Sequence, residues 1–303
     1  MSNTNPTNLS ASVRQRLLNL SRERREDFQY ILTRYGVERL LFRLSQSDYK
    51  SKFILKGATL IRIWSGKEYR PTRDIDFLGY GEYSEEELIE IFRNICSIDV
   101  ESDGLNFDLD SITIENIRAD NEYAGNRIKI NSTIENTRIR IQIDLAYGDA
   151  INPSVKKIKY PTLLDFSAPN IFIYPPESVV AEKLHALISL GIANTRMKDI
   201  YDILELSRIF SFNGNKIMTA IKKTFDRRKT VIPSDTPISF TKEFINAKNQ
   251  NWKAFLSRSG LENDSIPFSD TINELSLFIL PIFDAFSKNS NFPKKWDRNK
   301  EWH

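Results

Sequence analysis

Three segments between residues 107 and 147 alternate apolar and polar residues, and this pattern constrains the fold more than any other feature of the chain. Isoleucine or leucine recurs at every second position in three sets: Ile112 and Ile114; Ile128 and Ile130; and Ile139, Ile141, Ile143 and Leu145. Because successive side chains of a strand point to opposite faces, each set predicts a strand with one buried face. The pairs Asp103-Gly104 and Ala124-Gly125 are expected to form turns between strands.

Helical periodicity surrounds this region on both sides. Two N-terminal helices are expected to end near Ser47, and Ser84 followed by three glutamates predicts the start of a helix reaching about residue 97. Later helices are expected near residues 176–190, 196–210, 215–227, 241–257 and 268–286. The tail 287–303 is expected to be loosely held. These patterns predict three parts: N-terminal helices (1–50), an α/β core (51–165) and a helical C-terminal domain (166–303).

The histidine and cysteine content restricts the metal chemistry that this chain can support. Cys96 is the single cysteine of the 303 residues, and His185 and His303 are the two histidines. An internal disulfide and a multi-cysteine zinc site are therefore excluded, and a metal site would have to use carboxylates, which suit Mg²⁺ or Mn²⁺. Both Cys96 and His185 lie on predicted helices, and their side chains are expected to be buried there and not to bind a metal.

Charge and hydropathy suggest where the protein works. The formal net charge is +3 and the pI is about 8.7, which permits a nucleic-acid partner without requiring one. No run of about 18 apolar residues predicts a membrane span, and the N-terminus lacks the apolar core of a signal peptide. We therefore expect a cytoplasmic protein with no membrane partner.

Acidic residues mark the polar faces of two predicted strands. Asp74 and Asp76 are two apart in a strand near 73–78, so they share a face and lie roughly 6–7 Å apart along it. Asp144 ends the polar face of the strand 138–145. If the two strands are neighbours, three carboxylates converge and could hold two Mg²⁺ ions for in-line phosphoryl transfer. The alternative is that Asp74 and Asp76 form an ordinary solvated face.

A glycine turn precedes these aspartates. Lys56-Gly57-Ala58 separates a short apolar run at 53–55 from a second apolar stretch, Leu60 to Trp64. A glycine between a strand and a helix lets backbone amides approach a phosphate closely, and Lys56 could add positive charge. The alternative is a simple structural turn.

Two later helices carry charged residues that need partners. Lys183 has apolar residues at all four of its i±3 and i±4 positions, so it should emerge from a packed face and need a phosphate or an aspartate as its partner. The alternative is a lysine that reaches out to solvent. Arg196, Asp199 and Asp202 form a stripe that is usually a set of surface ion pairs, although Asp199 or Arg196 could also face a site.

Together these motifs resemble a known family. The chain carries, in order, Lys56-Gly57-Ala58, Thr72-Arg73-Asp74-Ile75-Asp76, Asp144, the segment Glu177 to Lys183 and the segment Arg196 to Asp202. This order is similar to that of the AbiEii/AbiGii toxins, which are nucleotidyltransferase-like toxins of abortive-infection (phage defence) and toxin–antitoxin systems, related to the mycobacterial MenT toxins. The matching segments span about residues 56–202.

The resemblance implies a fold and a role for each motif. The fold would be a DNA-polymerase-β-type nucleotidyltransferase with a mixed sheet, flanked by N-terminal helices and a C-terminal helical domain. The implied site residues are Lys56, Gly57, Ala58 and Thr59 at the triphosphate loop; Asp74, Asp76 and Asp144 as catalytic metal ligands; Lys183 at the nucleotide phosphates; and Asp199, with Arg196, in the fourth motif. Ala58 departs from the glycine or serine common in the family, and neighbouring Thr59 could supply the hydroxyl.

The implied activity is transfer of a nucleotide from an NTP to an RNA acceptor, the tRNA 3′ end, with Mg²⁺ or Mn²⁺ as cofactor. The implied partner is a cognate AbiEi-like antitoxin with a winged-helix segment, although direct contact with it stays open. Two other readings also stay open. One is nucleotidylation of a protein or small-molecule hydroxyl, and the other is a non-catalytic nucleotide-binding module.

Overall fold

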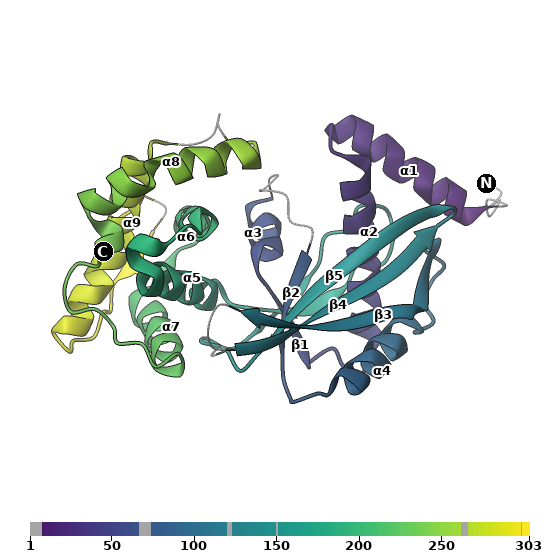
Figure 1. Cartoon of the computed structure of the whole chain (residues 1–303), viewed down its shortest axis with the longest axis horizontal. Coiled ribbons are helices and arrows are strands. Elements are labelled where there is room, and N and C mark those ends of the chain that lie inside the picture. The colour runs from purple at the N-terminus through teal and green to yellow at the C-terminus, as the bar shows by residue number, and fades with distance from the viewer. Residues whose placement is uncertain (1–7, 67–73, 120–122, 150, 262–265, 298) are drawn as a thin grey trace. The chain divides into compact units, whose positions relative to one another are not determined.

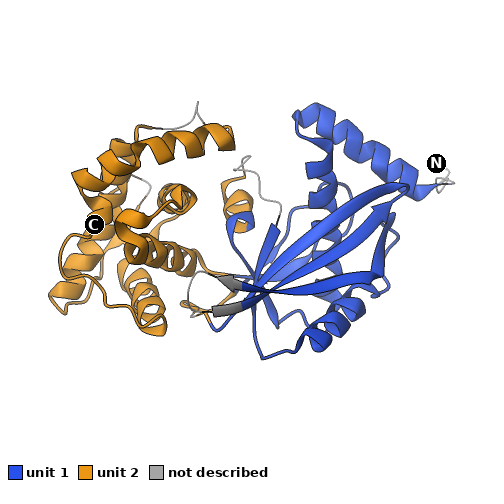
Figure 2. Ribbon diagram, viewed as in Figure 1, with its two compact units in different colours: residues 1–59, 72–148, 156–173 blue, residues 60–71, 149–155, 174–303 orange. Residues whose placement is uncertain are grey.

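The structure is a computed structural model that describes residues 8–66, 74–119, 123–149, 151–261, 266–297 and 299–303 (Figure 1). The chain forms two compact units (Figure 2). Unit 1 comprises residues 1–59, 72–148 and 156–173, and unit 2 comprises residues 60–71, 149–155 and 174–303. The three-part division expected from the sequence stays a prediction.

Unit 1 is built on a seven-stranded sheet with the order β3-β4-β5-β2-β1-β7-β6. Its strands are β1 (Phe53–Lys56), β2 (Asp74–Gly79), β3 (Leu105–Ala119), β4 (Tyr123–Ile134), β5 (Thr137–Tyr147), β6 (Lys156–Lys159) and β7 (Asn170–Ile173). β2 runs parallel to β5 and β1 runs parallel to β7, whereas the other pairs are antiparallel. The sheet is therefore mixed, and the expected α/β class with a mixed sheet is confirmed.

Helices cover the apolar face of this sheet. The alternating residues Ile139, Ile141, Ile143 and Leu145 of β5 are all buried. Helix α2 (Phe28–Gln46) contacts β5, and a Cβ at its Gly36 would lie 3.1 Å from side-chain atoms of Ile139 and Ile141. A residue without a side chain therefore lets the helix approach the sheet closely. The polar residues of β5 lie on the opposite face.

The other helices of unit 1 also begin and end close to where the sequence predicts. Helix α1 (Leu9–Arg24) precedes α2, and α4 (Glu85–Cys96) packs against β3. Ser84 caps α4 in a reciprocal capping box with Glu87, as its position before three glutamates predicts. Cys96 is buried at the end of α4, in agreement with its expected place in the core.

In unit 1, one predicted turn is wrong, and two strands of the seven-stranded sheet were not predicted from the sequence. Ala124-Gly125 lies inside β4, because the antiparallel pairing of β3 with β4 continues from Ala119 and Tyr123 through these residues. β6 and β7 are each four residues long, too short for a periodic signal. Their pairing with each other, and of β7 with β1, is decided by tertiary structure.

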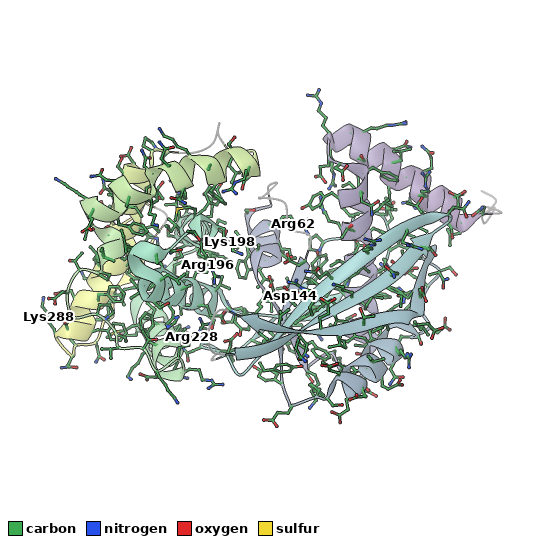
Figure 3. All side chains as sticks on the ribbon, in the orientation of Figure 1. Arg62, Asp144, Arg196, Lys198, Arg228 and Lys288 are labelled. Atoms are coloured by element: carbon green, nitrogen blue, oxygen red, sulfur yellow. The ribbon has the colours of Figure 1, made fainter. Side chains whose placement is uncertain are left out.

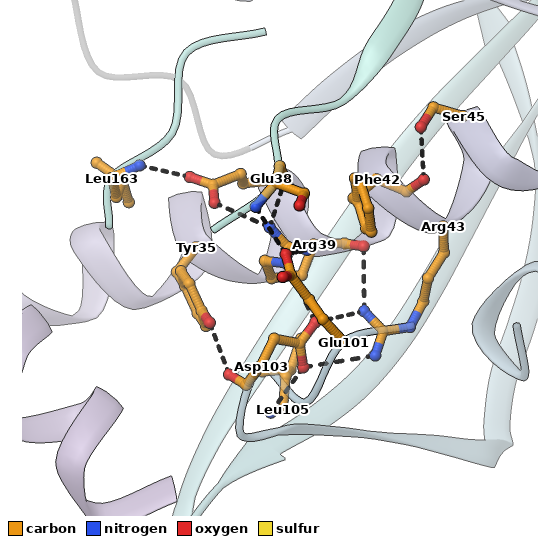
Figure 4. A network of polar contacts seen from close by, with 11 residues as sticks. Tyr35, Glu38, Arg39, Phe42, Arg43, Ser45, Glu101, Asp103, Leu105 and Leu163 are labelled. Atoms are coloured by element: carbon orange, nitrogen blue, oxygen red, sulfur yellow. Dashed lines mark hydrogen bonds and ion pairs between the residues drawn. The ribbon is translucent and has the colours of Figure 1, made fainter. Parts of the chain in front are cut away.

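A buried ionic network ties α2 to loops of unit 1 (Figure 4). Asp103 receives hydrogen bonds from Arg39 Nε at 3.1 Å and Arg43 Nη1 at 2.7 Å, and its backbone oxygen accepts one from Tyr35 at 2.6 Å. Glu38 Oε2 accepts a bond from the Leu163 amide at 2.7 Å. Because buried charges are costly unless they are paired, this network fixes α2 against the segment before β3 and the segment after β6.

Unit 2 is mainly helical. It contains α5 (Pro176–Leu190), α6 (Met197–Ile209), α7 (Gly214–Arg227), α8 (Lys242–Ser259) and α9 (Phe268–Ser287), with the short 3₁₀ segments η1 (Gly191–Ala193) and η2 (Ile238–Phe240). These five α-helices, α5 to α9, lie within a few residues of the predicted ranges. Helix α5 contacts both α6 and α7. In the described part of the chain, no helix combines the length and the apolar character needed to cross a membrane.

The C-terminal tail is firmly packed, so the expectation that it is loosely held is wrong. Trp296 lies in β9 (Lys295–Trp296), which pairs with β8 (Phe212–Asn213), and its buried indole donates a hydrogen bond to Ser207 O at 2.7 Å. Trp302 donates to Phe278 O at 3.0 Å and stacks on the Phe278 ring at 5.8 Å. Two large indoles with satisfied N–H groups therefore hold the tail against α6 and α9.

Candidate functional site

The structure places Asp76 and Asp144 opposite each other on neighbouring parallel strands. The pairing of β2 with β5 sets Asp76 against Asp144 and Asp74 against Gln142. Both aspartates of β2 alternate with the buried Ile75 and Phe77. Because paired residues of adjacent strands point to the same side, Asp74, Asp76 and Asp144 share the polar face of the sheet. Figure 3 labels Asp144 on this sheet.

Gly57 lies directly against one of these carboxylates. Its φ is +77°, a conformation that favours glycine, and a Cβ built there would lie 1.8 Å from Asp76 Oδ2. Lys56, the preceding residue, is the register partner of Asp76 across β1 and β2. Position 57 must therefore be a glycine, because only a residue without a side chain leaves room for the Asp76 carboxylate.

The remaining residues of the two sequence motifs have plainer positions. Ala58 and Thr59 are both buried at the start of α3 (Ala58–Ser65), the helix that follows Gly57. Thr72 and Arg73, which precede Asp74 in its motif, lie outside the described residues.

An arginine that the sequence did not single out completes the polar face. Arg127 of β4 is the register partner of Asp144, and it holds both carboxylate oxygens, with Nε 2.8 Å from Oδ1 and Nη2 2.7 Å from Oδ2. The hydrogen bond with Asp144 raises the pKa of the Arg127 guanidinium, and the charge of Asp74 acts in the same direction. Alternation with Ile128 and Ile130 puts Arg127 on the polar face, but only the strand register reveals its partner.

The residues on this face suit a divalent cation by their chemistry. Carboxylate oxygens are the ligands that Mg²⁺ and Mn²⁺ prefer, and the glycine at position 57 leaves room for the Asp76 carboxylate. Among the described residues, however, no three His, Cys, Asp or Glu side chains are grouped so as to hold a metal ion. Arg127 forms hydrogen bonds to both oxygens of Asp144, the third of these carboxylates.

In unit 2, Lys183, Arg196 and Asp199 come together. Lys183 Nζ lies 3.0 Å from Asp199 Oδ1 and 2.6 Å from Asp202 Oδ2, and Arg196 Nε lies 2.7 Å from Asp199 Oδ2. Of the two partner types predicted for Lys183, the structure shows aspartate. Asp199 and Asp202 are almost completely buried, so the interpretation of their stripe as surface ion pairs is wrong. Arg196, labelled in Figure 3, is more exposed.

The charges of this buried cluster stabilise one another. Burial by itself lowers the pKa of Lys183, but the charges of Asp199 and Asp202 outweigh it, and the net pKa is raised. Burial acts to raise the pKa of Asp199, yet Lys183 and Arg196 hold it below its ordinary value. Lys183 is therefore a permanent cation on α5.

His185, two residues further along α5, has the buried position expected from the sequence. Its Nε2 lies 2.7 Å from Thr230 Oγ1 and its Nδ1 lies 3.3 Å from Arg228 Nη1. Burial, with the neighbouring Arg228 charge, lowers the pKa of His185 to about 4. The imidazole is therefore neutral near pH 7.

Comparisons with solved structures give two distant matches. JHP933 from Helicobacter pylori is 16% identical, with 83% of this chain and 90% of that chain covered and a TM-score of 0.45. A second structure, of a candidate nucleotidyltransferase from H. pylori, is 15% identical, with 84% and 94% covered and a TM-score of 0.46. Both likenesses are too distant to inform on activity. No curated protein matches the chain in sequence.

A family model decides the identity of the chain. The model described as "Nucleotidyl transferase AbiEii toxin, Type IV TA system" matches residues 39–284, which is well over half of the 303 residues. The matched range includes both clusters described above, the polar face of the sheet in unit 1 and the Lys183 cluster in unit 2. The chain therefore belongs to the AbiEii family of nucleotidyl transferase toxins of type IV toxin–antitoxin systems.

Proposed function

We propose that this protein transfers a nucleotide from an NTP to an RNA acceptor, the 3′ end of tRNA, with a divalent metal as cofactor. The observation that carries this proposal is the register of Asp76 with Asp144, which gathers carboxylates on one face beside the Gly57 turn. The family supports nucleotidyl transfer, and the net charge of +3 is compatible with an RNA acceptor.

In this proposal Asp74 and Asp76 hold Mg²⁺ or Mn²⁺, with Asp144 as the third carboxylate. A metal bound there would stabilise the charge of the triphosphate and lower the pKa of the acceptor hydroxyl. The backbone at Gly57, with Lys56, Ala58 and Thr59 around it, positions the triphosphate. The acceptor oxygen would form a bond to the α-phosphorus, the bond from this phosphorus to pyrophosphate would break, and the hydroxyl proton would pass to the Asp144 carboxylate.

In unit 2, Lys183 is the residue proposed to bind a nucleotide phosphate. Lys183 carries a permanent positive charge, which suits a nucleotide phosphate. Asp199 and Asp202 hold the Lys183 ammonium in place, and Arg196 lies on Asp199 with part of its side chain exposed. Removal of Asp199 should therefore impair transfer, because Arg196 loses its partner in this cluster and Lys183 keeps only Asp202 of its two aspartates.

The experiment is a transfer assay with each α-labelled NTP, Mg²⁺ or Mn²⁺, and either total RNA or total cell protein as acceptor. Asp76→Asn should abolish transfer, because the amide keeps the size of the side chain but loses its charge. Asp108→Asn, the same change at an exposed position of β3, is the matched control and should transfer normally. Label in RNA supports the proposal, and label in protein or a small molecule would replace RNA as the acceptor. Nucleotide binding without turnover would contradict an enzymatic role.

We further propose that the activity is toxic in the cytoplasm, where NTPs and tRNA are present, and that it serves phage defence. A cognate AbiEi-like antitoxin with a winged-helix segment, encoded next to this chain, would neutralise it. Induction of the wild-type protein should arrest growth, and Asp76→Asn should not. Arrest by both forms would contradict toxicity through transfer.

A further inference from the structure

We propose that Arg127 competes with the divalent cation for Asp144, so that the third carboxylate is held in place by an arginine until a metal displaces it. The proposal rests on the proposed function for the identity of the cation site. It concerns Arg127, a residue that lies outside the sequence motifs.

Arg127 and Asp144 form a bidentate pair. Arg127 and Asp144 face each other across β4 and β5, and two hydrogen bonds of 2.8 and 2.7 Å engage both carboxylate oxygens. Such a bidentate guanidinium–carboxylate pair is among the stronger side-chain contacts and fixes the orientation of both groups. In this arrangement the Asp144 oxygens are directed at Arg127.

Arg127 balances part of the negative charge on the polar face of the sheet. Asp74, Asp76 and Asp144 bring three carboxylates to neighbouring positions of two strands, and like charges so placed repel one another. Arg127 sits on the same face, and the charge of Asp74 acts on it as well as that of Asp144. The guanidinium therefore supplies part of the positive charge that a metal would otherwise provide.

Arg127 and a divalent cation would compete for the same carboxylate, Asp144. A divalent ion that bound Asp144 would come within a few ångströms of the Arg127 guanidinium, and the two positive charges would repel. The Arg127 side chain is 32% exposed, so it has a route to solvent when the ion arrives. Metal binding and the arginine pair thus oppose each other, and loss of the arginine should strengthen metal binding.

The test measures Mn²⁺ binding to the nucleotide-free full chain by electron paramagnetic resonance. Arg127→Gln should bind Mn²⁺ about tenfold more tightly than the wild type, because a repelling charge is removed. Lys129→Gln is the matched control: it removes one positive charge two residues away on the same face of β4, where Lys129 pairs with Glu115 and not with Asp144. That variant should change the affinity by less than about twofold.

Two further variants keep the proposal falsifiable. Arg127→Lys retains the charge but not the bidentate contact, so its affinity should lie between those of the wild type and Arg127→Gln, and it serves as the readout if the glutamine variant does not fold. In an Asp144→Asn background, Arg127→Gln should no longer give the tenfold gain, because the carboxylate for which arginine and metal compete is absent.

Equal or weaker Mn²⁺ binding by Arg127→Gln, relative to Lys129→Gln, would overturn the proposal. So would a gain that persists undiminished in the Asp144→Asn background. The Mn²⁺ measurements need no nucleotide and no acceptor, so they test the role of Arg127 separately from the transfer reaction. If the proposed transfer reaction is wrong, Arg127→Gln should still bind Mn²⁺ tightly while the labelled-NTP assay gives no product.

Discussion

The backbone of Gly57 lies against the carboxylate of Asp76, so closely that a Cβ on the glycine would come within 1.8 Å of Asp76 Oδ2. The two residues are separated by 18 positions of sequence, yet the antiparallel pairing of β1 with β2 brings them together. One contact thus joins the loop proposed for the triphosphate to the strand proposed for the metal.

Gly57→Ala should therefore reduce the rate of nucleotide transfer by at least about 100-fold, because the new methyl group must displace the Asp76 carboxylate. Gly66→Ala is the matched control. Gly66 also has a positive φ, +64°, but nothing lies within 4 Å of a Cβ there, so this variant carries the backbone strain without the clash. The labelled-NTP assay and thermal unfolding compare the two. Equal activity in both variants would show that the contact with Asp76 is unimportant.

Lys183→Met should destabilise the protein by about 3–5 kcal/mol, because it removes the ammonium that the buried Asp199 and Asp202 share. Lys198→Met, at an exposed position of α6, should change stability by less than about 0.5 kcal/mol. Urea unfolding measures both. Adding Asp199→Asn and Asp202→Asn to Lys183→Met should restore part of the loss. A triple variant that is less stable than Lys183→Met would refute this explanation.

Glu38 should make the stability of unit 1 fall as the pH rises. Burial raises the pKa of Glu38 to about 7 from an ordinary value of 4.5, so the unfolded chain releases this proton at lower pH than the folded protein. Its contribution is fully present below pH 4.5 and is lost as the pH rises through about 7. Glu38→Gln should remove about 2 kcal/mol of the decrease between pH 5 and 8. Unchanged pH dependence in urea unfolding would contradict the assignment.

His185 should make the stability of unit 2 fall as the pH falls. Its pKa is lowered to about 4 from 6.5, mainly by burial, so the unfolded chain binds this proton first as the pH falls. Its contribution is present above pH 6.5 and is lost as the pH falls through about 4. His185→Gln should reduce the loss of stability between pH 7 and 5 by about 2 kcal/mol. An identical acid profile for wild type and variant would disprove this.

Local sequence was sufficient for most of the elements. The period-two runs predicted the long strands, since apolar residues at alternate positions, such as Ile139, Ile141 and Ile143, indicate a strand with one buried face. The capping residue Ser84 marked the start of α4, because a hydroxyl followed by glutamates satisfies a helix N-terminus from within the same segment. The polar-face positions of Asp74, Asp76 and Asp144 followed from the same alternation. Each of these inferences depends on neighbours within a few residues.

Only the tertiary structure decided which of these residues meet. The register of β2 with β5 set Asp76 against Asp144, and that of β4 with β5 gave Arg127 its partner. Likewise, the burial of Asp199 and Asp202 around Lys183, and of Trp296 in the tail, depends on how helices pack. Strand register and helix packing are contacts between distant parts of the chain, and no local pattern encodes their partners. The aspartates proposed for catalysis could be predicted from the sequence, whereas the contact of Arg127 with Asp144 could not.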